Sequence, residues 1–434
     1  MPIDRAPDAL RTRDVLIIQP SGIRYRARVL KIARTLLNSG RSVTFFTKMP
    51  PGTGLTEVHV DYAEGCPILL FPDAHDFIAA ARTKVPAWNW AFMVQYLQTA
   101  MWHYARQLRP RYIHTFNSAA IGIGHNFRNR LSLESTAPAW FHDFPEYTAG
   151  HRFTDDRRRD GGSDDEWQQT VIGHEAKYAR FPDACFTVSD EIASLLQSEY
   201  GLEAPPIVLL NVPRLSDFNP AHTPTIRRTL CLASETPLFV YSGGVTPLRG
   251  VHTLVSALEG VPEAHVALMT STRSPYLASL IDDARQHGAF RRLHVLPYVE
   301  PEFISSFLRD STAGIHPLTH YSNAEVALPN KLFDYLHAQV PVIVSDVRAM
   351  AHLVSQRGFG AVFKADDSND LARALKQVIR DRARIAKRIG DNEKFLRTYS
   401  WEAQEQRLLS VYDAADRRIA QPIQRGAEGA TSSK

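Results

Sequence analysis

The sequence predicts an α/β protein with two parallel sheets, and three observations lead to this prediction. Short apolar runs alternate with segments of helical periodicity along most of the 434 residues, which is the pattern of strands joined by crossover helices. This alternation pauses once, at residues 213–237, where Pro, Ser, Thr and Asp are frequent. Hydrophobic residues make up 44% of the chain, so each half can bury its own core. We therefore expect two α/β domains joined by a hinge.

The first domain is expected over residues 14–212 and opens with a strand, a helix and a second strand. Residues 15–19 (VLIIQ) form a buried-strand run. The helix that follows carries apolar residues on one face, and Gly40 ends it before the strand run SVTFFT. Further strand runs begin at residues 68, 111, 138, 184 and 207. Because strands alternate with helices, the sheet is predicted to be parallel and covered on both faces.

The second domain is expected over residues 237–399, after a linker at 213–236 with one short helical piece near Ile226. Its strand runs begin at residues 238, 265, 292, 313 and 340. Ligands of such sheets bind at the carboxyl ends of the strands, so two facing Rossmann-like domains would hold them in an interdomain cleft. An amphipathic helix at 400–419 is expected to pack back on the first domain, and the polar tail 420–434 to be disordered.

Two segments of the first domain stand apart from this pattern. The charged stretch at residues 151–166, which contains TDDRRRDGGSDDE, predicts a mobile loop. The aromatic-rich segment at residues 87–108 predicts a helix. Its expected apolar stripe consists of Phe92, Tyr96, Ala100 and Tyr104. We favour a helix of the domain core over a helix that dips into a membrane.

Composition narrows the function classes and the cellular location. A formal net charge of +4 gives no support for nucleic-acid binding driven by bulk charge. Three widely spaced cysteines fit neither a disulfide framework nor a zinc site. The first 14 residues do not resemble a secretory signal, and no run approaches the ~18 apolar residues of a spanning helix. We expect a soluble, cytoplasmic protein whose only membrane contact would be peripheral, at the inner face.

The first candidate binding segment is YSGGVTPLRG, at residues 241–250. Gly243 and Gly244 follow a strand and would let the backbone approach a ligand closely. A helix begins near Arg249, where free N–H groups and a guanidinium favour phosphate. The competing interpretation is a plain strand-to-helix turn with a surface arginine.

The second candidate segment spans residues 322–346 and contains ALPNKLFDYLHAQVPVI. Pro329 suits the first turn of a helix, so Asn330 and Lys331 would lie at its N-terminus, where phosphates are favoured. Asp334 lies one turn further on the same side and could accept hydrogen bonds from two ribose hydroxyls. The competing interpretation is an amphipathic helix with an ordinary surface Lys and Asp.

Together these segments resemble family 4 of the retaining glycosyltransferases, which have the GT-B fold, and the resemblance covers nearly the whole chain. It implies a donor diphosphate site at Gly243, Gly244, Arg249, Asn330 and Lys331, with Asp334 at the donor ribose. Many members carry two glutamates separated by seven residues. Asp334 takes the second of these positions, whereas the first falls on Val326, with Glu325 adjacent. Glu325, Val326 and Gly22 are therefore the residues expected at the donor sugar.

The first domain is expected to supply the acceptor side. Gly22 allows a tight turn after the first strand, and Arg24, Arg28 and Lys31 share one helical face. This face resembles the family's helix near the phosphate and the acceptor, which implies an acceptor or phosphate role for Arg24 and Arg28. It could also face a membrane, or be a solvated basic surface.

A second loop of the first domain carries the expected catalytic residues. FHDFPEYTAGH, at residues 141–151, resembles the family's loop that faces the transferred sugar. The resemblance implies polar contacts from His142, Asp143 and Glu146, although Pro145 stands where the family often has a histidine. A structural role for His142 remains the other interpretation.

The predicted function is transfer of a sugar from a nucleotide-diphosphate donor, UDP-sugar by default, to a hydroxyl acceptor. The acceptor would be a saccharide, a lipid-linked saccharide or a small molecule, as in glycan, polysaccharide or glycoconjugate biosynthesis. Retention of configuration is implied by the resemblance alone. No cofactor is expected, and no Asp-any-Asp motif indicates a metal ion. Two other hypotheses are a sugar-nucleotide epimerase on the same fold and a non-catalytic GT-B partner protein.

Overall fold

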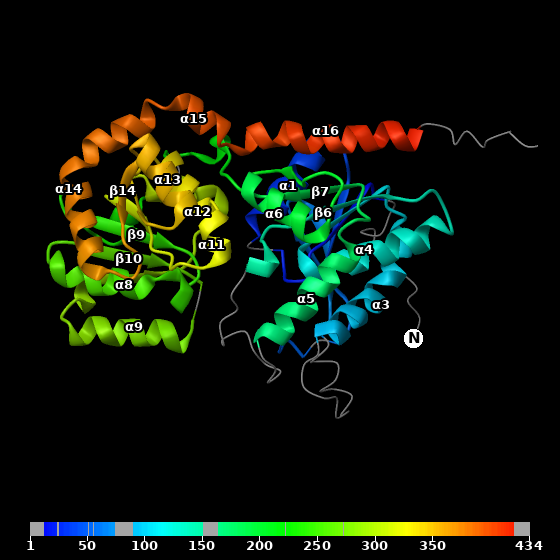
Figure 1. The fold of residues 1–434 in the computed structure, drawn as a ribbon, viewed down its shortest axis with the longest axis horizontal. Coiled ribbons are helices and arrows are strands. Elements are labelled where there is room, and N and C mark those ends of the chain that lie inside the picture. The colour runs from blue at the N-terminus through cyan, green and yellow to red at the C-terminus, as the bar shows by residue number, and fades with distance from the viewer. Residues whose placement is uncertain are drawn as a thin grey trace, which may run out of the picture.

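The computed structural model describes residues 13–23, 26–50, 52–54, 56–73, 90–150, 164–221, 223–271 and 273–420. They form two Rossmann-like α/β domains that lie side by side, each built around one sheet (Figure 1). This architecture confirms the predicted fold class. Most of the segment predicted as a loop at 151–166, and nearly all of the tail, lie outside the described residues.

The first sheet has eight strands in the order β3-β4-β2-β1-β5-β6-β7-β8. All neighbours are parallel except the antiparallel pair β3 and β4. The strands are β1 (Val15–Ile18), β2 (Val43–Lys48), β3 (His59–Ala63), β4 (Cys66–Phe71), β5 (Tyr112–Phe116), β6 (Ala139–Asp143), β7 (Ala184–Thr187) and β8 (Ile207–Val208). The helices are α1 (Ala27–Asn38), α3 (Trp90–Leu108), α4 (Asn117–Ser132), α5 (Asp164–Tyr178) and α6 (Asp190–Tyr200).

Alternate residues of the central strands pack against different helices, as the period of a strand requires. Leu16 and Ile18 of β1 join a core with α3, α4, α5 and α6. Val15 and Ile17 join a second core with α1 and α16 (Trp401–Ala420). The C-terminal helix α16 therefore covers part of the first sheet, and Figure 1 shows it running along that domain.

The second sheet has six parallel strands in the order β11-β10-β9-β12-β13-β14. The strands are β9 (Leu238–Ser242), β10 (His265–Met269), β11 (Leu293–Leu296), β12 (Ala313–His316), β13 (Val342–Ser345) and β14 (Gly360–Phe363). The helices are α7 (Ile226–Thr229), α8 (Val251–Ala257), α9 (Pro275–Gln286), α10 (Ile304–Leu308), α11 (Ser322–Val326), α12 (Asn330–His337), α13 (Arg348–Arg357), α14 (Ser368–Gly390) and α15 (Glu393–Thr398). A single large core holds this domain together.

Helix α3 packs on the first sheet, but its buried face differs from the predicted stripe. Phe92 is 44% exposed, whereas the residue after it, Met93, is buried. The fully buried positions that follow are Leu97, Met101 and Ala105. The helix is apolar around much of its circumference, so periodicity alone did not determine which side faces the core.

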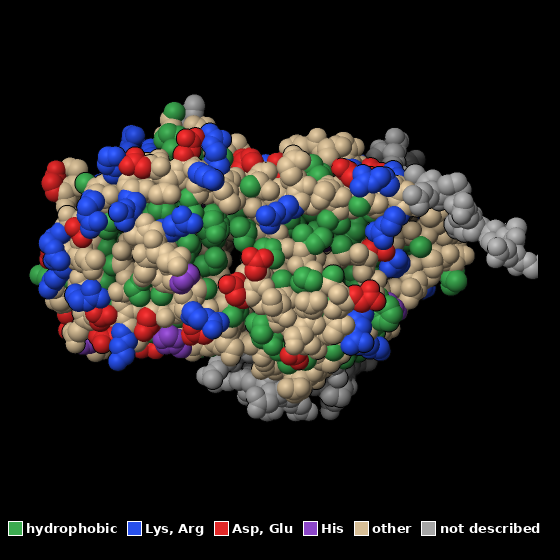
Figure 2. All heavy atoms as spheres, turned by 45° about the horizontal axis from the view of Figure 1, so that its top comes forward, with side chains coloured by type: hydrophobic (Ala, Val, Ile, Leu, Met, Phe, Trp, Pro, Cys, Tyr) green, Lys and Arg blue, Asp and Glu red, His purple; other side chains and the backbone are tan. Residues whose placement is uncertain are grey.

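The face of the molecule shown in Figure 2 carries interspersed charges of both signs. On the face shown in Figure 2, basic and acidic side chains alternate over both domains, and no broad area of one sign gathers. Among the described residues, no helix is both long and apolar enough to cross a membrane.

Candidate functional site

A cleft of about 360 Å³ lies between the two domains, where the carboxyl ends of their strands face each other. The first domain contributes Gln19 after β1 and Asn117 after β5. The second domain contributes Gly244 after β9 and His316 at the end of β12. The volume of the cleft falls in the usual range for small-molecule sites.

The glycine loop after β9 forms one wall of this cleft. Gly243 has φ +148, a conformation that side chains disfavour, and a Cβ atom there would lie 2.9 Å from Lys331 Cε. The Tyr241 hydroxyl donates a hydrogen bond of 2.6 Å to the Gly244 carbonyl. The bare backbone of Gly243 therefore lets the Lys331 side chain lie directly over the loop.

Two cationic side chains reach the cleft beside this loop. Lys331 lies in the first turn of α12, after Pro329 at the N-cap. Arg249 ends a short 3₁₀ helix, and Gly250 follows it at φ +64. A Cβ atom on Gly250 would lie 1.8 Å from the Pro317 carbonyl oxygen, so glycine is required to pack this turn against the end of β12. Burial lowers the pKa of Lys331, and the nearby Arg249 charge lowers it further, while Asp334 opposes both effects.

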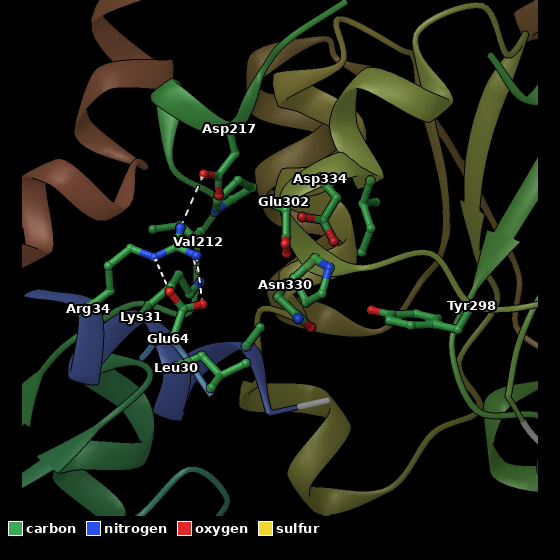
Figure 3. Close-up of a pocket in the computed structure, with 14 residues that line it drawn as sticks. Leu30, Lys31, Arg34, Glu64, Val212, Asp217, Tyr298, Glu302, Asn330 and Asp334 are labelled. Carbon is green, nitrogen blue, oxygen red and sulfur yellow. Dashed lines mark hydrogen bonds and ion pairs between the residues drawn. The ribbon is translucent and has the colours of Figure 1, made fainter. Parts of the chain in front are cut away.

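Asp334 faces a second, smaller cavity that adjoins the cleft (Figure 3). This cavity has a volume of about 40 Å³, and Asn330 and Tyr298 line both it and the main cleft. Asp334 is 7% exposed, and burial raises the pKa of its carboxyl to about 6, against the opposing Lys331 and Lys31 charges. The structure thus brings Asn330, Lys331 and Asp334 together on one helix, with the carboxylate directed toward the hinge.

The basic face predicted on the first helix is not a solvated surface. Lys31 Nζ donates hydrogen bonds to Asn211 Oδ1, at 3.0 Å, and to the Val212 carbonyl. Burial lowers the pKa of Lys31 to about 7. Arg28 is 5% exposed, so the solvated interpretation is wrong for this side chain, while Lys31 is half-buried and bonded to the hinge.

Arg28 is held by the protein itself. Its guanidinium donates to Asp143 Oδ2 at 2.9 Å and to the carbonyls of Leu209 and Thr187. Arg28 also lines the cleft, but these contacts use all three of its side-chain nitrogens and hold it between strand ends. Arg24 lies outside the described residues. Gly22 adopts φ +90, and its N–H donates to Thr47 Oγ1 at 3.0 Å.

The structure separates the three residues expected to be catalytic. His142 and Asp143 are fully buried in β6, and His142 Nδ1 lies 2.8 Å from Thr115 Oγ1. Burial lowers the pKa of His142 well below its usual value and raises that of Asp143, which the Arg28 charge opposes. Glu146 is exposed and lines the cleft with Pro145. Of the three, Glu146 is therefore the one placed to meet a ligand.

Two of the three residues expected at the donor sugar, Glu325 and Val326, also take structural positions. Glu325 accepts hydrogen bonds from the Arg348 N–H at 2.9 Å and pairs with His320 at 2.5 Å, so it caps the start of α13. Val326 is 7% exposed and packs into the core of the first domain. Its carbonyl accepts a hydrogen bond from Ser189 of that domain at 3.2 Å. These contacts tie α11 to both domains.

Several polar cleft residues were not predicted from the sequence, and four of them are Gln19, Asn117, Tyr298 and His316. Asn117 adopts φ +64, and its side-chain amide donates to Gln19 Oε1 at 2.9 Å. Three of the four follow or end a strand, so the rule that ligands bind at strand carboxyl ends could have found them. Within the described part of the chain, no three His, Cys, Asp or Glu side chains gather as a metal site would require.

Two facing Rossmann-like domains with an interdomain cleft define the GT-B fold class, and comparison with solved structures confirms it. Sucrose-phosphate synthase from Thermosynechococcus elongatus matches with a TM-score of 0.71 and 16% identity, covering 94% of this chain and 100% of that one. HepE of Anabaena, in complex with UDP-glucose, matches with a TM-score of 0.67 and 14% identity, covering 93% and 100%.

Sequence comparison finds similarity to glycosyltransferases. Residues 223–394 match the model of the family Glycosyl transferases group 1. A D-inositol 3-phosphate glycosyltransferase from Geodermatophilus obscurus is 23% identical over 424 residues, covering 92% of this chain and 87% of that protein. Together these findings support a group 1 glycosyltransferase.

Proposed function

We propose that the protein transfers a sugar from a nucleoside diphosphate, bound mainly by the second domain, to a hydroxyl group of an acceptor on the first. The observation that carries this proposal is the convergence of Arg249 and Lys331 on one cleft, beside the Gly243–Gly244 loop and the N-terminus of α12. Departure of the diphosphate places negative charge at this point. Fixed cations and backbone N–H groups there stabilise the transition state more than the bound substrate.

The remaining contacts of the proposed donor follow from the two adjoining cavities. Asp334 accepts hydrogen bonds from the ribose hydroxyls, and Tyr298 lies on the nucleoside side. The UDP-glucose complex of HepE supports uridine as the base and UDP-sugar as the donor. The acceptor is a saccharide, a lipid-linked saccharide or a small molecule, in the cytoplasm or at the inner membrane face. Retention is proposed from the resemblance to family 4.

A panel of nucleoside diphosphates tests the donor site directly. We expect one of UDP, GDP, ADP and TDP to raise the melting temperature of the protein, because a ligand that binds only the folded state stabilises it. The shift is expected to survive a chelator, since the proposal assigns the diphosphate charge to Arg249 and Lys331, without metal. It is expected to be lost in Lys331→Ala.

Other outcomes of the panel point elsewhere. A shift that the chelator removes would contradict the metal-independent proposal. A shift without sugar transfer to any acceptor would indicate a non-catalytic GT-B protein. Formation of an epimeric sugar from the UDP-sugar alone would indicate an epimerase.

Donor affinity is expected to fall as the pH drops below about 6. The proposed ribose contact needs the ionised Asp334 carboxylate, whose pKa is about 6 because of burial. The affinity for the donor therefore reaches its highest value above this pH, and it falls up to about tenfold per pH unit below it. The dissociation constant of the nucleoside diphosphate, measured by calorimetry from pH 5 to pH 8, shows this directly.

The matched control for this pH dependence is Asp334→Asn. A terminal phosphate also gains a proton near pH ~6, so the difference between wild type and variant isolates the carboxylate. A 2′,3′-dideoxynucleoside diphosphate lacks both hydroxyls, and we expect the two proteins to bind it with the same pH profile. Identical profiles with the ribonucleotide as well would contradict the role of Asp334.

A further inference from the structure

His316 occupies a central position in the cleft that the sequence analysis did not assign. It is the last residue of β12, at the carboxyl edge of the second sheet, next to β9 and its glycine loop. Its imidazole stacks on the Tyr241 ring, with centroids 6.2 Å apart and an angle of 10° between the planes. His316 and Tyr241 both line the cleft. The stacking fixes the orientation of the imidazole at the floor of the site.

The imidazole of His316 is buried, and its two nitrogens form no hydrogen bond with the described residues. The residue is 2% exposed, and neither Nδ1 nor Nε2 has a hydrogen-bond partner among the described residues. Buried polar groups in native proteins are almost always paired, and each unpaired one destabilises the folded state. Both nitrogens of one ring are unpaired here, so the ligand-free protein carries a cost that a bound polar ligand would remove.

The surroundings of His316 identify the ligand chemistry. Burial lowers the pKa of His316 well below its usual value, and the Arg249 and Lys331 charges lower it further. The ring is therefore neutral, with one N–H donor and one acceptor nitrogen. A neutral donor that shares the cleft with two cations suits an anion, to which it adds a hydrogen bond without adding a third positive charge.

His316 also lies away from the nucleoside end of the site. The smaller cavity, which holds Asp334 and is lined by Asn330 and Tyr298, does not include His316 among its lining residues. His316 shares the main cleft with Arg249 and Gly244. A nucleotide whose ribose meets Asp334 would therefore bring its distal phosphate, not its base, to His316.

We propose that His316 is a donor-binding residue that donates a hydrogen bond to the distal phosphate of the nucleoside diphosphate. This inference rests on the proposed function and deepens it. It assigns the unsatisfied imidazole to discrimination between nucleoside diphosphates and monophosphates. The same proton would then stabilise the leaving diphosphate as the bond to the sugar breaks.

The test compares a nucleoside diphosphate with its monophosphate in wild type, His316→Phe and His316→Gln. The nucleotide is the one that wild type binds in the panel, and dissociation constants are measured by calorimetry. His316→Phe keeps the stacking on Tyr241 and removes both nitrogens. We expect it to weaken diphosphate binding about 10- to 100-fold, the value of one hydrogen bond to a charged group. Monophosphate binding should change less than twofold, and His316→Gln should restore part of the loss through its amide donor.

A second readout separates this role from a structural one. Because the nitrogens are unsatisfied in the free protein, His316→Phe is expected to keep or raise the melting temperature while it weakens diphosphate binding. His352→Phe, on the exposed side of α13, is the matched control and should leave binding unchanged. Equal losses for both nucleotides, or no loss for either, would overturn the inference. No nucleotide binding by wild type would instead overturn the proposed function, and the inference with it.

Discussion

Lys331→Ala and Arg249→Ala are each expected to lower kcat/KM for sugar transfer about 10²–10³-fold, the usual effect of losing one donor to a developing anion. Both side chains line the cleft beside the glycine loop. The negative charge on the diphosphate grows as the sugar departs, so their contribution is larger in the transition state than in the bound donor. We therefore expect kcat to fall more than KM rises.

The fold should survive the loss of Lys331. Burial lowers the pKa of Lys331, which means that the free protein gains little from holding this cation. Its alkyl chain does pack over Gly243, with Cε 2.9 Å from the position of a Cβ atom there. Lys331→Met keeps that packing and removes the charge, so it is the better variant for separating activity from stability.

Initial rates of transfer and melting temperatures, measured on the same preparations, check this prediction. The matched control is Lys376→Ala, which removes one positive charge from the exposed side of α14. No residue of this helix lines the cleft. Arg249→Lys keeps a charge but loses the planar fork of donors, and should lie between wild type and Arg249→Ala. Turnover at the wild-type rate in both alanine variants would refute the assignment of the diphosphate site.

The fold could be predicted because most of its strands are buried on both faces. Such strands appear in the sequence as continuous apolar runs separated by helical periods. Two strands were not predicted, and the reason differs between them. Strand β3 is largely exposed and carries no apolar run, while β14 has four residues with a glycine at its start. Each adds to an edge of its sheet, where the sequence pattern is weakest.

The positions of Gly244, Arg249 and Lys331 at the cleft could be predicted, because the pattern that indicates each of them is local in sequence. A glycine pair after a strand indicates a loop whose backbone can approach a ligand, and Pro-Asn-Lys indicates the N-terminus of a helix. The acceptor side could not, because the partner of each polar residue is distant in sequence. Arg28 bonds to Asp143, 115 residues away, and this pairing turns an apparent surface arginine into a buried one. On the second domain, Glu325, which was expected at the donor sugar, likewise finds its partner 23 residues later, at the start of α13.

Removal of either partner of the Arg28–Asp143 pair is expected to destabilise the first domain by about 3–5 kcal/mol, because an unpaired charge then remains buried. Arg28 Nη2 and Asp143 Oδ2 lie 2.8 Å apart, with Asp143 fully buried. For a domain of this size the melting temperature should fall by about 6–20 °C. Thermal unfolding of Arg28→Met and Asp143→Asn, followed by circular dichroism, measures the loss.

The combined variant Arg28→Met/Asp143→Leu decides whether the loss comes from the unpaired charge. Replacement of a whole buried ion pair by apolar residues is often neutral, so the double variant should recover much of the stability. Recovery will be incomplete, because Arg28 also bonds the carbonyls of Thr187 and Leu209. A double variant as unstable as the sum of the single ones would show that the pair does not act as a unit.

The same variants separate the two roles that Asp143 could have. If its carboxylate contacted the transferred sugar, Asp143→Asn would keep its melting temperature and lose activity at all temperatures. If it positions the strand ends, activity should follow the folded fraction and return on cooling. Asp143 ends β6, Thr187 ends β7 and Leu209 follows β8, so one guanidinium joins three neighbouring strand ends at the cleft. Arg28 is therefore a positioning residue. Its loss should destabilise the first-domain side of the cleft, where the acceptor is proposed to bind, before it affects the donor site on the second domain.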